Sequence, residues 1–79
     1  MIIGYFADGI WSHRALDKLL ANDALKIAFV CARYDRADPI LKQRSFESGV
    51  PFLVHPDINS EDFMANVETY ECDLFVSMS

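Results

Sequence analysis

The run Lys26-Ile27-Ala28-Phe29-Val30-Cys31-Ala32 decides the fold, because after its lysine it is apolar without a break. Continuous apolar runs rich in β-branched and aromatic residues are typical of strands that are covered on both faces, as in parallel sheets. Similar runs recur about every 25 residues along the chain. They predict three further strands, at Ile2–Ala7, Pro51–His55 and Asp73–Met78.

The first segment between these runs predicts a helix over residues 11–22. Its polar residues lie outside a single apolar stripe. His13 precedes Asp17 by one helical turn, so we expect these two side chains to form a surface pair. The expected apolar stripe comprises Trp11, Ala15, Leu16, Leu19 and Leu20.

Two further helices are indicated by capping signals. Asp38-Pro39 combines a side-chain acceptor with a proline at the first helical position, and Gly49 is suited to the residue just after the helix end. Asn59-Ser60-Glu61-Asp62 combines a cap with two carboxylates at the positive end of the helix dipole. The residues expected to face the sheet are Ile40, Leu41 and Ser45 in the second helix, and Phe63, Met64, Val67 and Tyr70 in the third.

The order strand-helix-strand-helix-strand-helix-strand predicts a three-layer α/β fold, a Rossmann-like parallel sheet with helices on its faces. The 79 residues are expected to form one partial α/β domain over residues 1–79. No apolar run reaches the roughly 18 residues of a membrane span, and the N-terminal residues lack the features of a signal peptide. A cytoplasmic protein without a membrane partner is the expectation.

Charge excludes a general nucleic-acid binder, because the net charge is −5. Four of the seven basic residues nevertheless fall close together in the sequence, at Arg33, Arg36, Lys42 and Arg44. They form either a solvated loop and helix face or a local anion-binding patch. The two cysteines, Cys31 and Cys72, have no metal-binding spacing and are interpreted as buried thiols. We expect no metal site.

The connection after the first strand, Asp8-Gly9-Ile10-Trp11-Ser12, is the first candidate site. It enters a helix N-terminus, which favours anions, and Ser12 could either cap the helix or donate to a ligand. The alternative is an ordinary turn in which Trp11 packs as a lid. A dinucleotide site is disfavoured because GxGxxG is missing, so Asp35 is interpreted as a turn residue paired with Arg36. A phosphoacceptor receiver domain is disfavoured because Asp57 follows the third strand only after Pro56.

Several segments in order resemble the N-terminal half of the formyltransferase family, which includes methionyl-tRNA formyltransferase and the N-formyltransferases of nucleotide-linked amino sugars. The resemblance covers the whole chain. The matching segments are Ile3-Gly4-Tyr5-Phe6-Ala7-Asp8-Gly9, Ala15-Leu16-Asp17-Lys18-Leu19-Leu20, Tyr34-Asp35-Arg36, Ser48-Gly49-Val50-Pro51-Phe52-Leu53-Val54 and Cys72-Asp73-Leu74-Phe75-Val76-Ser77.

The resemblance implies transfer of a formyl group from 10-formyltetrahydrofolate to a primary amine. The family's catalytic Asn and His stand two residues apart, and no Asn-x-His occurs here. We therefore expect no catalytic residue in this chain. The resemblance places the fourth strand beside the first. It also implies an acceptor-side loop, formed by Asp8, Gly9, Ile10, Trp11 and Ser12. The donor-side strand end that it implies is formed by Ser77, Met78 and Ser79.

The acceptor is expected to be a nucleotide-linked amino sugar. Enzymes of this family that act on initiator tRNA typically carry a longer, glycine- and lysine-rich insertion after the Asp-Arg pair, whereas Asp35-Arg36 is followed at once by Ala37-Asp38-Pro39. The basic cluster keeps methionyl-tRNA as the second choice, because phosphate contacts need only Lys and Arg.

The segment Cys72–Ser79 is expected to be a buried strand with no chain after it, as in an N-terminal fragment of a larger enzyme. Such a fragment should expose the edge of its fourth strand and self-associate. Two alternatives are a non-catalytic α/β module that binds an anion or a protein, and a truncated gene product without a function of its own.

Overall fold

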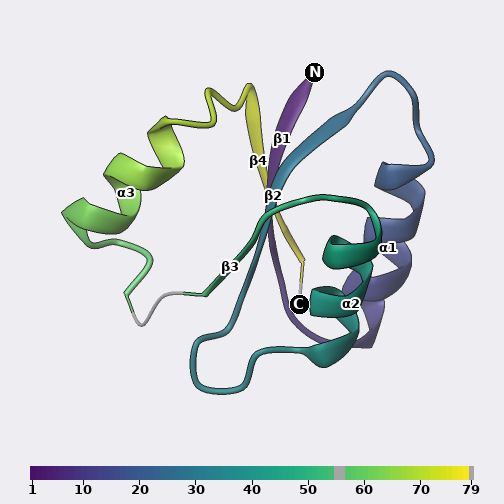
Figure 1. Ribbon diagram of the computed structural model, residues 1–79, viewed down its shortest axis with the longest axis horizontal. Coiled ribbons are helices and arrows are strands. Elements are labelled where there is room, and N and C mark those ends of the chain that lie inside the picture. Colours follow the sequence, from purple (N-terminus) through teal and green to yellow (C-terminus); the bar gives the residue numbers. More distant parts are fainter. Residues whose placement is uncertain (55–56, 79) are drawn as a thin grey trace.

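The computed structural model describes residues 1–54 and 57–78, and these residues form a parallel α/β fold. Four strands pair in the order β3-β2-β1-β4, and every pairing is parallel (Figure 1). The predicted fold class is thus confirmed, and so is the expectation that the fourth strand lies beside the first. The strands are β1 (Ile2–Ala7), β2 (Lys26–Ala32), β3 (Phe52–Val54) and β4 (Leu74–Met78); the helices are α1 (Ile10–Leu20), α2 (Pro39–Glu47) and α3 (Glu61–Glu68).

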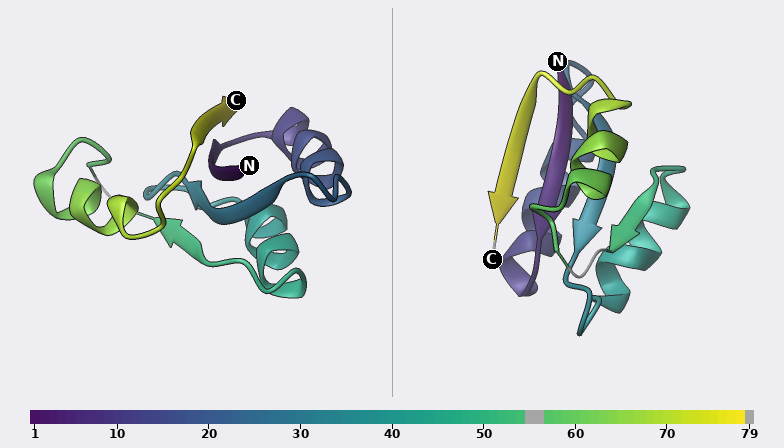
Figure 2. Two further views of the ribbon diagram at one scale, coloured as in Figure 1. Left: turned by 90° about the horizontal axis from the view of Figure 1, so that it is seen from above. Right: turned by 90° about the vertical axis from the view of Figure 1, so that its left-hand side faces the viewer.

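The helices lie on opposite faces of the sheet. Figure 1 shows the sheet nearly edge-on, with α1 and α2 on one side and α3 on the other. In Figure 2 all four strands run in the same direction, so their carboxyl ends share one end of the molecule. His55, predicted to end the third strand, lies outside the described residues. Within the described part of the chain, no helix is long and apolar enough to cross a membrane.

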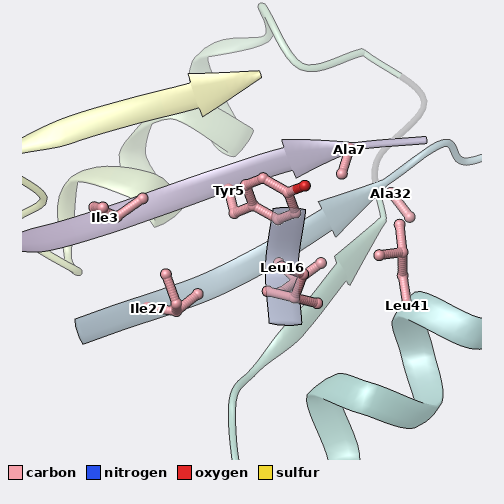
Figure 3. Close-up of a cluster of buried hydrophobic side chains, with 8 residues drawn as sticks. Ile3, Tyr5, Ala7, Leu16, Ile27, Ala32 and Leu41 are labelled. Carbon is pink, nitrogen blue, oxygen red and sulfur yellow. The ribbon is translucent and has the colours of Figure 1, made fainter. Parts of the chain in front are cut away.

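The face that carries α1 and α2 holds an aliphatic core around Tyr5 (Figure 3). Tyr5 is fully buried, and its hydroxyl donates a hydrogen bond to the carbonyl oxygen of Ser12 at 2.8 Å. This bond attaches the first turn of α1 to the middle of β1. Burial raises the pKa of Tyr5, so the phenol remains a donor. The other buried members of this core are Ile3, Ala7, Leu16, Ile27, Val30, Ala32 and Leu41.

The face under α3 holds an aromatic core that is built over Gly4. A Cβ atom at Gly4 would lie 2.6 Å from the ring of Phe29 and 2.8 Å from that of Phe75. Phe6 meets Phe29 edge-on at a centroid distance of 5.4 Å and Phe75 at 5.8 Å. Glycine is therefore needed here for space, because the two rings occupy the volume that a side chain would fill. Phe63 and Val67 of α3 cover this cluster.

A β-bulge in β2 sets which of its side chains face which core. Ile3 pairs with Ile27, but the next residue, Gly4, pairs with Phe29, so Ala28 is an extra residue in the ladder. Ala28 and Phe29 consequently both belong to the aromatic core, and strict alternation resumes after them. Without the bulge, the large ring of Phe29 would leave the face where Gly4 makes room for it.

The predicted helix caps are confirmed, whereas the predicted ion pairs are wrong. Asp38 accepts hydrogen bonds from the amides of Ile40 and Leu41, and Ser60 accepts one from Phe63. Gly49 has the left-handed φ of 69° expected after a helix end. His13 does not pair with Asp17: its Nε2 lies 2.7 Å from Oδ2 of Asp38, so that carboxylate joins α1 to α2. Asp17 instead accepts a hydrogen bond from Arg44 of α2 at 2.7 Å.

Some residues that were assigned to apolar stripes are exposed. Trp11 is 66% exposed, and Ser12 takes the buried position beside Tyr5 in its place. Ile40 and Met64 also lie at the surface, since α2 and α3 each present a narrow stripe to the sheet. The prediction that the fourth strand is buried is wrong. β4 is one of the two edge strands, and Leu74 and Phe75 are about half exposed. Leu41, Ser45, Phe63 and Val67 are buried as predicted.

We predict that Asp38→Ala destabilises the protein by about 1–2 kcal/mol, because it removes the N-cap of α2 and the link to α1. Burial opposes the charge of Asp38, but hydrogen bonds from His13, Leu41 and Ile40 outweigh it and lower the pKa of this carboxyl. Its contribution is therefore present above the unfolded pKa of about 3.9 and is lost as the pH falls through the lower folded pKa. Urea unfolding near neutrality and in acid measures the free energy of unfolding of Asp38→Ala and of the unaltered protein. The two values should converge at low pH. Asp23→Ala removes an exposed carboxylate and is the control, so it should change the free energy of unfolding little. If the free energy of unfolding depended on pH in the same way in both variants, the role of Asp38 would be contradicted.

We predict that Gly4→Ala costs about 1–3 kcal/mol, because the new methyl group must displace the rings of Phe29 and Phe75. Urea unfolding monitored by circular dichroism measures the loss. Ser77→Ala, a small change on the neighbouring strand, serves as the control. An unchanged unfolding midpoint for Gly4→Ala would show that the aromatic core has free space.

Candidate functional site

The candidate site is a cavity at the carboxyl ends of β1, β2 and β4. Its volume is about 740 Å³, which is within the usual range for small-molecule sites. The chain runs from β1 through β2 to β3 on one side, and β4 then joins the other side of β1. The cavity thus lies where the strand order reverses, the usual ligand position in open α/β sheets. Its lining comprises Phe6, Ala7, Asp8, Cys31, Ala32, Arg33, Tyr34, Asp35, Asp57, Ile58, Asn59, Ser77 and Met78.

Arg33 joins the ends of β1 and β2 across this cavity. Its Nε and Nη2 atoms donate to the two carboxylate oxygens of Asp35, at 3.2 and 3.0 Å. Its Nη1 atom lies 3.6 Å from Oδ2 of Asp8. The hydrogen bonds and charge of Asp35, with a smaller contribution from Asp8, raise the pKa of Arg33. The same hydrogen bonds lower the pKa of Asp35, so this group stays ionised at neutral pH. Asp35 was predicted to pair with Arg36, and its hydrogen-bond partner is Arg33 instead.

The charged lining of the cavity is negative overall. Asp8, Asp35 and Asp57 face a single guanidinium, that of Arg33, which already contacts two of these carboxylates. An incoming anion would therefore meet net repulsion, whereas ammonium and hydroxyl groups would meet acceptors. Tyr34 and Ile58 add apolar surface beside these acceptors. The cavity is suited to a ligand that is rich in hydrogen-bond donors.

The acceptor-side loop of the sequence prediction is divided by the structure. Asp8 lines the cavity, and Gly9 is the N-cap residue of α1 with a φ of 87°. Ile10 and Trp11 are exposed and are absent from the cavity lining, so Trp11 is no lid over it. Ser12 is buried, and its hydroxyl donates to the carbonyl oxygen of Gly9. Ser12 is thus neither the cap of α1 nor a residue of the cavity, because α1 begins at Ile10, three residues before the start that a cap at Ser12 would give.

The donor-side strand end reaches the same cavity. Ser77 and Met78 line it, while Ser79 lies outside the described residues. The amide of Asp8 donates to the carbonyl oxygen of Met78 at 3.0 Å. The loop after β1 and the tip of β4 are therefore neighbours, as the resemblance implied.

The four basic residues do not act as one group. Arg33 binds Asp35 at the cavity, whereas Arg44 binds Asp17 between α2 and α1. The hydrogen bond and charge of Asp17 raise the pKa of Arg44. Arg36 lies in the loop after β2 and Lys42 on α2, and both are exposed. Two of the four predicted members are thus held by carboxylates at separate places.

The two cysteines are free thiols. Cys31 is buried beside the cavity, and burial raises its pKa to about 11. Cys72 also has a raised pKa, because of burial and the neighbouring charge of Asp73. Both groups are therefore protonated near neutrality, which makes them poor nucleophiles. The prediction of buried thiols is confirmed for Cys31, whereas Cys72 is only partly buried.

One whole segment of the site was missed by the sequence reasoning. Asp57, Ile58 and Asn59 lie between β3 and α3 and form one side of the cavity. Asp57 was considered only as a phosphoacceptor and set aside because of its distance from the third strand. The available signal was its place in a loop at the carboxyl edge of the sheet, where the loops of all parallel strands converge.

We predict that Arg33→Gln raises the pKa of Asp35 toward its usual value, because Asp35 loses its hydrogen-bond donor. A nuclear magnetic resonance titration of the Asp35 carboxyl carbon measures this shift. Arg36→Gln removes the same charge from a position with a weaker, purely coulombic effect, and it should move the pKa much less. Equal shifts in the two variants would mean that the hydrogen bonds of Arg33 are not the cause.

Comparison with protein-family models and with curated proteins finds no match to this chain. The strand order and the position and charge of the cavity are therefore the features that bear on function. They are typical of a small-molecule binding site at the reversal of the strand order.

Proposed function

We propose that this chain forms the acceptor-binding part of a formyltransferase-type domain, and that its cavity takes the amine-bearing sugar of a sugar nucleotide, with the anionic diphosphate outside the cavity. The observation that carries the proposal is the negative cavity at which Asp8, Arg33 and Met78 meet. A primary amine is protonated in water near neutrality and is recognised by carboxylates. Sugar hydroxyls are also donors, and Asp35 and Asn59 supply acceptors for them.

The strand order supports this proposal. β4 lies beside β1, as the resemblance to formyltransferases implies, and the loop after β1 contacts the β4 tip. Asp8 of the expected acceptor-side loop is thereby brought to one cavity with Ser77 and Met78 of the expected donor-side strand end. In this proposal Asp8 holds the acceptor amine and Ser77–Met78 form the donor-side border.

The role of this chain is binding and orientation. Formyl transfer requires a neutral amine that attacks the formyl carbon, and donors that stabilise the developing oxyanion. A carboxylate at Asp8 can hold the ammonium form and fix its position before a proton is removed. The Asn and His that serve the family have no Asn-x-His counterpart in this sequence, so the transfer step is assigned to none of its residues.

The cavity fits the acceptor better than it fits 10-formyltetrahydrofolate. That donor would supply the formyl group, but its glutamate carboxylates would face Asp8, Asp35 and Asp57. The strand end at Ser77 and Met78 carries no charge. We therefore derive no step through the donor from this cavity.

A small acceptor is favoured over methionyl-tRNA. A polyanionic acceptor needs several basic groups that are free to contact phosphates. Arg33 and Arg44 are held by Asp35 and Asp17, which leaves Arg36 and Lys42 of the predicted patch. The dispersed basic residues thus support a sugar nucleotide.

A non-catalytic binding module is the second candidate. Among the described residues of the lining there is no histidine, and the thiol beside it has a pKa of about 11. Such a lining can bind a donor-rich ligand without carrying out proton transfer. A binding module would show the same amine preference, and it would lack formyl transfer.

We predict that a dTDP-linked amino sugar binds the protein at least about tenfold more tightly than the matching sugar with a hydroxyl in place of the amine. Loss of one charge-assisted hydrogen bond corresponds to about 1.5–3 kcal/mol. Isothermal titration calorimetry measures both affinities. Asp8→Asn should remove most of the difference, whereas Asp23→Asn, which lies outside the cavity, should keep it.

Equal affinities for the two sugars, or binding that Asp8→Asn leaves intact, would refute an amine site at Asp8. We expect no turnover when the 79-residue chain is mixed with 10-formyltetrahydrofolate and the amino sugar. Formyl transfer by this chain would show that it carries catalytic groups, against the assignment of binding alone.

A further inference from the structure

Tyr34 is the one tyrosine that belongs to neither core of the sheet. Of the other two, Tyr5 is buried and holds α1, and Tyr70 packs against Phe29 at a centroid distance of 5.1 Å. Tyr34 is 62% exposed, and within the described part of the chain its ring contacts no other aromatic ring. It nevertheless lines the candidate cavity. A large ring thus stands at the border of the site without a role in the fold.

A second exposed apolar side chain lines the cavity from the neighbouring loop. Ile58 is 47% exposed and lies between β3 and α3. β2 and β3 pair in parallel, with Ala32 opposite Val54, so the loops that follow them leave the sheet side by side (Figure 2). Both loops lie across β1 from β4. Tyr34 and Ile58 therefore form an apolar rim on one part of the cavity.

This apolar rim suits a flat, uncharged group better than an anion. The lining beside it carries three carboxylates, and its single guanidinium is bound by Asp35. A phosphate group would be repelled inside such a lining. A nucleobase is uncharged near neutrality and presents two apolar faces. Stacking of a base on an aromatic side chain is also tolerant of the kind of base, because every base has a π face.

We propose that the nucleoside part of the acceptor binds at the apolar rim, with its base stacked on the ring of Tyr34 and in contact with Ile58. This inference rests on the proposed function, because it takes the amino sugar to occupy the cavity beside Asp8. Tyr34 is thereby a specificity-determining residue. It distinguishes an amino sugar that is linked to a nucleotide from the same sugar without the nucleoside.

The position of Arg33 agrees with this order of groups. Arg33 contacts Asp8, where the amine is placed, and directly precedes Tyr34, where the base is placed. Its Nε and Nη2 atoms donate to Asp35, whereas Nη1 lies 3.6 Å from Oδ2 of Asp8, beyond hydrogen-bond length. The side chain is about half exposed, so its Nη1 atom can donate to a phosphate oxygen outside the cavity. The diphosphate then lies between the sugar and the base.

Isothermal titration calorimetry tests the role of Tyr34 with two ligands. One is the dTDP-linked amino sugar, and the other is the same amino sugar with a single phosphate in place of dTDP. Tyr34→Ala should weaken binding of the dTDP-linked sugar at least about fivefold, because it removes the stacking surface, and should leave binding of the sugar phosphate unchanged. Tyr34→Phe keeps the ring and should keep both affinities. Phe46→Ala removes an exposed ring outside the cavity, and as the control it should also keep both.

Nuclear magnetic resonance tests the stacking itself. The H6 proton of the thymine base should move upfield when the dTDP-linked sugar binds, because it enters the shielding region of the Tyr34 ring. The shift should persist in Tyr34→Phe and disappear in Tyr34→Ala. A merely structural role of Tyr34 would not produce a shift that follows the presence of the ring.

The outcomes separate this inference from the proposed function. Suppose that the amine preference is present and is removed by Asp8→Asn, but Tyr34→Ala changes both ligands equally or neither. The contact with Tyr34 would then be overturned, and the amine site would stand. A thymine shift that depends on Tyr34, without any amine preference, would support the nucleoside contact and refute the amine site.

Discussion

The absence of a side chain at Gly4 is the constraint on which the rest of the structure depends. The rings of Phe29 and Phe75 occupy the space above it, one from β2 and one from β4. β1 is thereby joined to both neighbours by side-chain packing as well as by its hydrogen-bond ladders. The next residue, Tyr5, anchors α1 on the opposite face through Ser12. Two adjacent residues of the central strand thus connect all three layers.

The position of the cavity follows from this central strand. Because β2 and β4 flank β1 in parallel, the groups that follow each strand arrive at one edge. Asp8, Arg33 and Met78 meet there although they are distant in the sequence. Arg33 tempers the repulsion between Asp8 and Asp35, but it does not cancel the negative charge of the whole lining. The binding preference is therefore a property of the ends of the strands, and the helices act mainly as supports.

The sequence was sufficient for features that depend on local chemistry. Strand β2 follows from an unbroken apolar run, and the starts of α2 and α3 follow from the side-chain acceptors of Asp38 and Ser60. Features that depend on register were not predictable. The bulge at Ala28 exchanges the faces of the residues before and after it, and no local pattern marks it. The partner of His13 depends on which helices become neighbours, so the nearby charge of Asp17 was the wrong guide. Asp35 pairs with a basic residue close in sequence, but with Arg33 and not with Arg36.

The position of the candidate site was predictable from the sequence, but its charge was not. A ligand position at the carboxyl edge could be expected from the order of strands and helices alone. Its negative character could not, because it arises when Asp57 joins Asp8 and Asp35 from a separate loop. The predicted basic patch is divided for two reasons: Arg44 binds Asp17, which only the folded chain brings near, and Arg33 binds Asp35, two residues further along the chain.

The two faces of the sheet are covered unequally, and this has a consequence for motion. Two helices cover the aliphatic face, and Ser12 and the His13–Asp38 pair hold them in place. The aromatic face has α3 alone, which contributes only Phe63 and Val67 to the buried core. Amide exchange should therefore be fastest in α3, whose local opening costs less free energy than global unfolding. Since Asp57 and Asn59 lead into this helix, each such opening also removes one wall of the cavity. Ligand occupancy and the protection of α3 are thus two measures of a single equilibrium.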